Sequence, residues 1–199
     1  MLRGPWRRKT FHEGDGVMKK LLVVVDYQKD FVDGALGFAG AEKLEAGILR
    51  AVENTLAAGG YVLFTRDTHG ADYLNTREGR FLPVPHCIAG TPGHRLYGGL
   101  ARYEETPPPR TALLDKPTFG SADIAAAAAA LCGGRPDAIE VCGVVTDICV
   151  ITNALLLHTA FLEADIRVLV PLCGSGDAKK AAQALDVLAG MGLVENGAR

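Results

Sequence analysis

The stretch AIEVCGVVTDICV, residues 138–150, changes in its middle from strand-forming residues to the start of a helix. Its first four residues are typical of a buried strand, and residues 148–162 carry apolar side chains at helical spacing. Thr146 or Asp147 would cap that helix, which places Cys149 in its first turn. Unpaired N–H groups and the helix dipole favour a thiolate there. Because free cysteine is also a common small core residue, the stretch alone leaves both interpretations open.

Apolar runs alternate with helical segments along the rest of the chain. Strands are expected over residues 21–25, 61–65, 112–114 and 166–170, helices over 41–58, 123–131 and 177–189, and a short last strand over 193–194. This alternation predicts an α/β fold, a Rossmann-like three-layer sandwich around a mostly parallel sheet of about six strands. Asp26, Asp67, Lys116 and Thr146 follow the ends of predicted strands. They should gather along the rim where such sheets bind ligands.

Composition and charge narrow the classes of function. The 199 residues are 48% hydrophobic and 22% charged, which fits one globular domain with a sizeable core. The net charge of -2 gives no footprint for nucleic acid or an anionic membrane and favours a small neutral ligand. No apolar run approaches the length of a membrane span. The five cysteines form no C-x-x-C pair, which argues against a disulfide scaffold and fits a reducing cytoplasm.

Two segments stand apart from this alternation. Residues 1–17 are basic at first but lack the apolar core of a signal peptide. We therefore expect a flexible N-terminal extension or a misplaced start codon there, and a single domain over 18–199. Residues 70–110 show no clear period and hold most of the prolines, yet they carry large apolar side chains that need a surface to pack on. We therefore expect an ordered cover over the binding rim, with His94 at the surface.

A nucleophilic cysteine needs a base and a group that keeps the base ionised. Asp26 closes the first predicted strand and is placed to be that base. Lys116 closes another strand, and Pro117 keeps it in extended backbone so that its side chain can reach the rim. A solvated salt bridge for the aspartate and a surface position for the lysine are the alternatives.

Three motifs occur in order after predicted strands: Asp26-Tyr-Gln-Lys-Asp-Phe31, Lys116-Pro-Thr-Phe-Gly-Ser121 and Gly143-Val-Val-Thr-Asp-Ile-Cys149. With them the chain resembles, from about residue 21 to 194, the isochorismatase-like cysteine hydrolases, whose best-known amidase branch is nicotinamidase. The resemblance implies that the protein hydrolyses a small amide. Members of this family are often homo-oligomers, so the resemblance implies that state here as well.

Residue by residue, the resemblance assigns roles to the three motifs. It implies a catalytic triad of Asp26, Lys116 and Cys149, with a cis peptide bond between Val144 and Val145 that shapes an oxyanion hole. The N–H groups of Val145 and Cys149 would be the oxyanion donors. Val144 would contact the substrate.

A second signal is Asp67-Thr68-His69 after a strand, followed by Pro85-His86-Cys87. One carboxylate and two imidazoles suit zinc, iron or manganese, although the spacing alone also fits a turn with a capping aspartate. Nicotinamidases are similar to this chain in both segments. The resemblance therefore implies that Asp67, His69 and His86 hold a divalent metal, which would bind the ring nitrogen of the substrate.

Around these residues the chain departs from the nicotinamidases. Tyr73 and Asn75 occupy the positions where some members have a further histidine, and the aromatic residue before the His-Cys motif is missing. Phe31 remains as one stacking partner for a substrate ring. Phe81, Tyr73 or Tyr97 would have to supply a second aromatic face.

The sequence thus predicts a cysteine amidohydrolase that converts a small carboxamide to an acid and ammonia through a thioester, as nicotinamidases and pyrazinamidases do. One alternative is a metal-independent hydrolase of a carbamoyl, ureido or maleamate-type amide. Another is a non-enzymatic small-molecule binding protein or thiol sensor. No G-x-S-x-G or Walker A motif supports a serine hydrolase or a nucleoside triphosphatase. The exact amide, the metal and the oligomeric state stay open.

Overall fold

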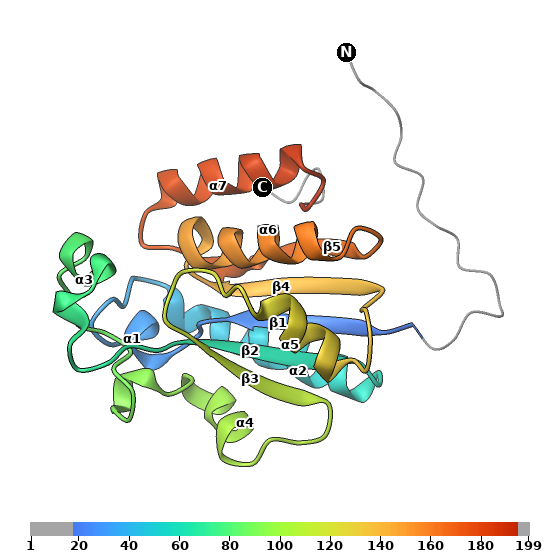
Figure 1. The fold of residues 1–199 in the computed structure, drawn as a ribbon, viewed down its shortest axis with the longest axis horizontal. Coiled ribbons are helices and arrows are strands. Elements are labelled where there is room, and N and C mark those ends of the chain that lie inside the picture. The colour runs from blue at the N-terminus through green and yellow to red at the C-terminus, as the bar shows by residue number, and fades with distance from the viewer. Residues whose placement is uncertain (1–17, 195–199) are drawn as a thin grey trace.

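The computed structural model describes residues 18–194, so the extension predicted over residues 1–17 lies outside the described part. Strands and helices alternate along the chain, as expected (Figure 1). The elements are β1 (Lys20–Val25), α1 (Lys29–Val32), η1 (Ala41–Leu44), α2 (Glu45–Ala57), β2 (Tyr61–Asp67), η2 (Tyr73–Asn75), α3 (Arg77–Phe81), η3 (Pro92–His94), η4 (Gly98–Ala101), α4 (Arg102–Glu105), β3 (Thr111–Lys116), α5 (Ile124–Leu131), β4 (Ala138–Val144), η5 (Thr146–Val150), α6 (Ile151–Ala160), β5 (Asp165–Gly174) and α7 (Ala178–Gly190).

The strands of the described residues form one parallel sheet of five strands in the order β3-β2-β1-β4-β5. Residues 21–25 of the central strand β1 are fully buried, as expected for a parallel strand covered on both faces. The sheet thus has one strand fewer than the six or so predicted. Residues 193–194 form no strand, because the chain turns directly after α7 and the buried Leu193 side chain packs into the core. The Leu193 carbonyl nevertheless accepts a hydrogen bond from Val168 N of edge strand β5.

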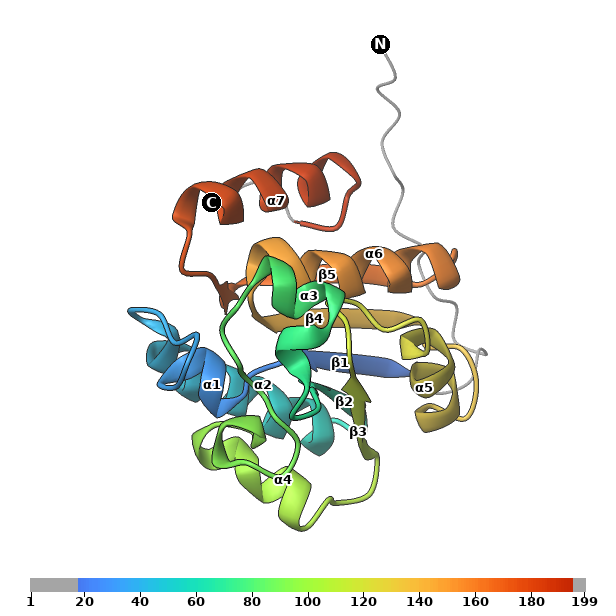
Figure 2. The same ribbon diagram turned by 60° about the vertical axis from the view of Figure 1, so that its left-hand side comes forward.

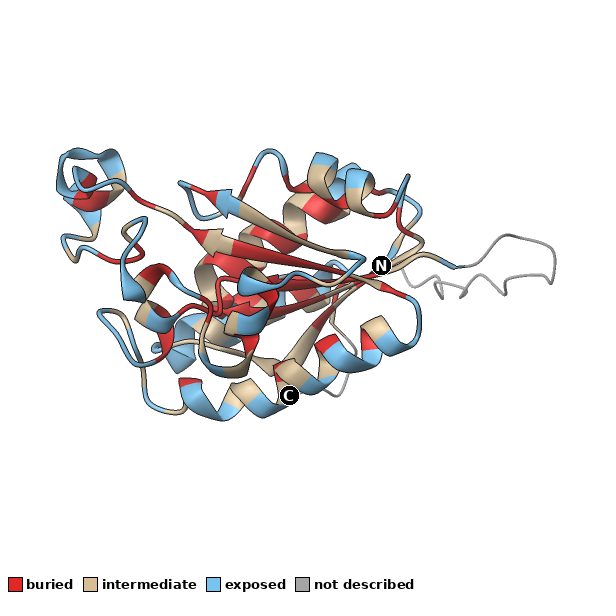
Figure 3. Ribbon diagram, turned by 90° about the horizontal axis from the view of Figure 1, so that it is seen from below, coloured by how far each residue is buried: buried red, intermediate tan, exposed pale blue. Residues whose placement is uncertain are grey.

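Helices cover both faces of the sheet, which confirms the three-layer α/β fold (Figures 1 and 2). One apolar core joins the sheet to α5, α6 and α7, and a second joins it to α1, α2 and α4. Figure 3 shows the strands buried between helices whose outer sides are exposed. Within residues 18–194, no helix is both long and apolar enough to cross a membrane.

The segment over residues 70–110 is an ordered cover, as predicted. It consists of the short helical segments η2, α3, η3, η4 and α4, and α3 lies beyond the end of the sheet toward which the strands run (Figures 1 and 2). The prediction that His94 lies at the surface is wrong, because the side chain is 8% exposed and its Nε2 lies 2.8 Å from Thr68 Oγ1. This contact helps to fasten the cover to the loop after β2.

Residues 138–150 fold as strand β4 followed by η5, a single π-helical turn. Gly143 has φ 118°, and a Cβ atom there would lie 2.1 Å from the Val25 carbonyl oxygen, so only glycine fits this close approach to β1. The predicted side-chain cap is wrong, since neither Thr146 nor Asp147 caps the helix. The Val145 carbonyl, directly before the turn, instead accepts two of its backbone N–H groups.

Candidate active site

Asp26, Lys116 and Cys149 meet at the carboxyl rim of the sheet. Asp26 directly follows β1, Lys116 ends β3, and Cys149 lies in η5 directly after β4. The Lys116 Nζ atom lies 2.6 Å from Asp26 Oδ2 and 3.8 Å from Cys149 Sγ. Their exposed fractions are 0%, 0% and 3% for the aspartate, lysine and cysteine. The structure therefore brings together the three side chains that the sequence motifs single out, and a fully buried Lys116 excludes the surface alternative.

The Asp26 carboxylate is held in place from two sides. Its backbone has φ 46°, the left-handed conformation that aspartate adopts more readily than most residues. The Thr65 hydroxyl donates a 2.7 Å hydrogen bond to Asp26 Oδ1, which leaves Oδ2 for Lys116. Lys116 Nζ also donates to the Thr118 carbonyl at 2.9 Å. The carboxylate and the ammonium are thus fixed by groups outside the ion pair.

Burial sets the protonation of the cysteine. It raises the pKa of the Cys149 thiol well above its usual range, although the Lys116 ammonium works against this shift. The thiolate expected at a helix start is therefore not favoured, because desolvation outweighs the nearby positive charge. Burial also raises the pKa of Asp26, opposed by Lys116. For Lys116 burial would lower the pKa, but Asp26, Cys149 and Asp67 raise it above its usual range. The lysine stays charged beside a protonated thiol.

The peptide bond between Val144 and Val145 is cis, as the resemblance implied. Val144 is fully buried at the end of β4, and Val145 directly precedes the turn that carries Cys149. Of the two residues whose N–H groups are expected to be oxyanion donors, Val145 therefore lies directly before the π turn and Cys149 lies within it.

A second cluster lies beside the triad. Asp67, His69, Glu78 and His86 each offer a ligand atom, and these atoms lie within 4.8 Å of one another. Asp67 Oδ2 is 2.9 Å from His69 Nε2 and 3.1 Å from His86 Nε2, and Glu78 Oε1 is 3.4 Å from His69 Nε2. Asp67 Oδ1 lies 3.7 Å from Lys116 Nζ. One carboxylate thus faces both the cluster and the triad.

The donor set fits a divalent transition metal. His86 Nδ1 lies 2.8 Å from the Val84 carbonyl, which can only accept, so Nδ1 donates there and Nε2 is the ring atom left to bind a metal. Nε2 faces the Asp67 carboxylate at 3.1 Å, a position from which both groups could bind one cation. Asp67 Oδ1 is buried without a hydrogen-bond partner. Two imidazoles and two carboxylates suit zinc, iron or manganese.

Aromatic rings line this cluster. The Phe31 ring meets the His86 ring edge-on at 5.5 Å, and Tyr73 lies 4.5 Å from the His69 ring and 5.0 Å from that of His86. Among the three candidates for a second aromatic face, Tyr73 is the one that contacts the cluster. Tyr97 packs on Tyr27, and Phe81 is 84% exposed.

The first motif also supports the cluster through side chains to which the sequence assigned no role. Gln28 is fully buried; its Nε2 donates to the carbonyls of Asp67 and His94, and its Oε1 accepts from Asp67 N. Asp30 Oδ2 accepts a 2.7 Å hydrogen bond from Cys87 N, next to His86. Gln28 therefore holds the end of β2, and Asp30 holds the turn that carries His86.

Comparison with known proteins agrees with this geometry. The isochorismatase domain family matches residues 20–195. The chain belongs to the isochorismatase family. The isochorismatase family protein PncA of Bacillus subtilis (strain 168) is 32% identical over 151 residues, which cover 72% of this chain and 77% of that protein.

Two solved structures share the fold. The nicotinamidase/pyrazinamidase PncA of Bacillus subtilis superposes with a TM-score of 0.79 at 28% identity, over 90% of this chain and 100% of that chain. The pyrazinamidase of Pyrococcus horikoshii, crystallised in complex with zinc, superposes with a TM-score of 0.74 at 23% identity. The latter match covers 89% of this chain and 97% of that chain.

Glu78 is the member of the cluster that sequence reasoning missed in this isochorismatase-family chain. It lies on α3, which is only five residues long and begins where Thr76 Oγ1 accepts a hydrogen bond from Gly79 N. A threonine three residues before that glycine is a recognisable helix start. This signal was available in the sequence, but it does not show that the helix would dock over His69.

Proposed function

We propose that this protein is a cysteine amidohydrolase of nicotinamidase type, which converts a small carboxamide to the acid and ammonia. The observation that carries the proposal is the buried constellation of Asp26, Lys116 and Cys149, with Lys116 Nζ 2.6 Å from the carboxylate and 3.8 Å from the sulfur. The family match and the 28% identity to a nicotinamidase/pyrazinamidase support the same chemistry.

In the first half of the reaction, Cys149 attacks the carboxamide carbon while Asp26 takes the thiol proton. The raised pKa of the thiol fits this order, because the sulfur stays protonated until a base accepts its proton. The negative charge that develops on the carbonyl oxygen is stabilised by the N–H groups of Val145 and Cys149. Asp26 then gives the proton to the departing nitrogen, ammonia leaves, and a thioester on Cys149 remains.

In the second half, water replaces ammonia. Asp26 accepts a proton from the water molecule as its oxygen attacks the thioester carbon. The C–S bond then breaks, Asp26 returns the proton to the sulfur, and the acid and the Cys149 thiol are released. The Lys116 ammonium keeps Asp26 ionised between these transfers. Because it is buried and donates to the Thr118 carbonyl as well, it remains fixed through both halves.

We propose that Asp67, His69, Glu78 and His86 hold a divalent metal. When bound there, such an ion would accept a lone pair from the substrate and orient its carboxamide toward the nucleophile. A pyridine or pyrazine ring offers that lone pair, and Phe31 lies beside His86 to pack against the ring. Val144, at the end of β4, would contact the same substrate. This donor set favours an aromatic amide over the metal-independent alternative.

A thiol sensor fits the site less well. Redox-sensing cysteines are accessible and have a low pKa, whereas Cys149 is 3% exposed and burial raises its pKa. All five cysteines of the chain lie among the described residues and are free, which supports a reducing cytoplasm as the proposed location. We also propose that the protein is a homo-oligomer. Light scattering on the purified protein tests this, because it measures the mass of the assembly.

The substrate proposal is tested by ammonia release. Purified protein should deamidate nicotinamide and pyrazinamide, should lose this activity with a chelator, and should react poorly with aliphatic amides. The same assay is run over carbamoyl, ureido and maleamate-type compounds. Metal-free protein that prefers those compounds would replace the proposed substrate class while leaving the triad in place. Protein inert toward every amide would favour a binding or sensor role.

A further inference from the structure

Asn153 joins the two elements that carry Cys149 and Lys116. It lies in α6, four residues after the cysteine, and is fully buried. Its Nδ2 donates to the carbonyls of Cys149 at 2.8 Å and Phe119 at 3.1 Å, and its Oδ1 accepts from Ser121 N at 3.1 Å. One carboxamide thus binds the nucleophile's own backbone and, at two points, the loop that follows β3.

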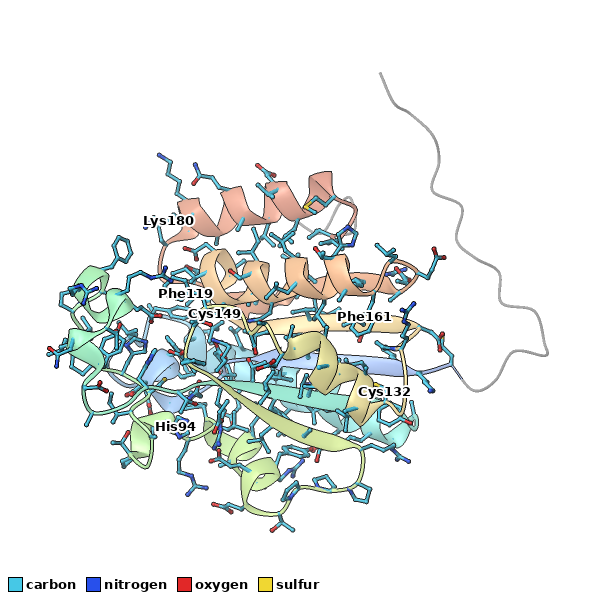
Figure 4. All side chains as sticks on the ribbon, viewed as in Figure 1. His94, Phe119, Cys132, Cys149, Phe161 and Lys180 are labelled. Carbon is cyan, nitrogen blue, oxygen red and sulfur yellow. The ribbon has the colours of Figure 1, made fainter. Side chains whose placement is uncertain are left out.

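That loop, residues 117–121, is also the support of the lysine. Lys116 Nζ donates to the Thr118 carbonyl at 2.9 Å, inside the segment that Asn153 fastens. The loop is pressed closely on α6, since a Cβ atom on Gly120 would lie 2.4 Å from Thr152 Cγ2 and 2.8 Å from Leu156 Cδ1. Figure 4 shows Phe119 and Cys149 in the same region of the rim, and the Asn153 hydrogen bonds join them.

We propose that Asn153 is a positioning residue that sets the spacing between the Lys116 ammonium and the Cys149 sulfur. A contiguous set of contacts runs from the Cys149 carbonyl through Asn153 to the loop, and from Thr118 to the ammonium. A fully buried polar side chain with each of its polar atoms bonded holds its partners in one geometry. Loosening this link would let the ammonium move away from the sulfur without removing any triad side chain.

The inference rests on the proposed role of Cys149 as nucleophile, but its test needs no substrate. The rate at which iodoacetamide alkylates Cys149 is followed by peptide mass spectrometry, with Cys149→Ala as the background. The charged groups that face this sulfur are Lys116 of β3, Asp26 after β1 and Asp67 of β2. Asn153→Leu, which keeps the number and branching of the side-chain heavy atoms and removes all three hydrogen bonds, should slow alkylation at neutral pH about tenfold, as expected if the thiol pKa rises by about one.

Two further variants separate positioning from stability. Gly120→Ala keeps Asn153 but forces the loop away from α6, so it should slow alkylation in the same way. It tests the proposal independently if Asn153→Leu does not fold. Leu157→Ala removes a fully buried side chain from the same helix and leaves the three Asn153 hydrogen bonds in place, and it should lower the melting temperature while the alkylation rate stays at the wild-type value.

If an amide substrate is found, kcat should fall in Asn153→Leu and Gly120→Ala while KM changes little, because the link acts on the reacting groups. Wild-type or faster alkylation in both variants would overturn the inference. Amide turnover absent from the wild-type protein, with alkylation still slowed in the variants, would contradict the proposed function and leave the positioning role of Asn153 in place.

Discussion

The triad side chains stand on strand ends or on the turn directly after a strand, whereas two members of the metal cluster, Glu78 and His86, come from the cover over residues 70–110. Strand register fixes the first group: Asp67 pairs with Lys116 across β2 and β3, and Val25, next to Asp26, pairs with Gly143 of β4. The second group depends on how the cover docks. The two halves of the site should therefore respond differently to substitution.

The largest effect is expected at the nucleophile. Cys149→Ala should lower amide turnover at least ~10³-fold, because no other group at the site can form the thioester. Removing one sulfur atom should cost about 1 kcal/mol of unfolding free energy. Initial rates of ammonia release and a denaturant titration measure the two quantities, and bound metal should be unchanged.

The matched control is Cys142→Ala. Cys142 is also buried and lies on β4, but it packs in the second core, whereas Cys149 packs in the first. It should keep turnover within about twofold of the wild-type value while losing a similar amount of stability. Equal activity in Cys149→Ala and Cys142→Ala would remove Cys149 from the chemistry.

The strand-borne half of the site could be predicted because its signal is local. An apolar run that ends in a charged residue marks a buried parallel strand and its rim, and this pattern places Asp26, Asp67 and Lys116. The pairing of these residues into a triad came from the motifs and not from periodicity. Five strands formed rather than about six, since the apolar pair at 193–194 is too short to tell from the end of a turn.

The rest depends on tertiary packing. The cover has no period, so neither the position of Glu78 on α3 nor the burial of His94 could be read from the residues. The helix start predicts a thiolate at Cys149, but burial decides its protonation, and burial becomes known only once α5 and α6 are packed on the sheet.

Substitutions in the cover should have an intermediate effect, on metal binding. Purified protein should carry about one equivalent of divalent metal, and His86→Ala should lose it. Glu78→Gln should weaken metal binding on the order of 10–100-fold, the loss typical of even outer-shell partners. Elemental analysis and a chelator competition measure both. Expressed as free energies, both changes should weaken metal binding more than they lower the stability of the strand-borne core.

His158→Ala is the control for the histidine, since His158 lies on α6 and outside the cluster. It should keep the metal. If Glu78→Gln binds metal as tightly as the wild-type protein while His86→Ala does not, the site has three protein ligands and Glu78 only packs beside it. Wild-type metal content in His86→Ala would remove the cluster from consideration as a metal site.

The smallest effect, and the sharpest test of the strand-borne half, is a change in pH dependence. The Lys116 ammonium favours the charged thiolate, so Lys116→Met should raise the pKa of Cys149 further. Since the thiolate is the reactive form, alkylation at any pH below that pKa should slow, about tenfold if the thiol pKa rises by one, and the increase in rate should move to higher pH. Asp26 acts on the thiol pKa in the opposite direction, through its charge and through a side-chain hydrogen bond, so the prediction holds while Asp26 keeps its charge. Lys29→Met, at an exposed lysine paired with Asp33, is the control and should leave the profile unchanged. A Lys116→Met profile that coincides with the wild-type curve would show that the lysine does not act on the sulfur, and the 3.8 Å approach would then be packing alone.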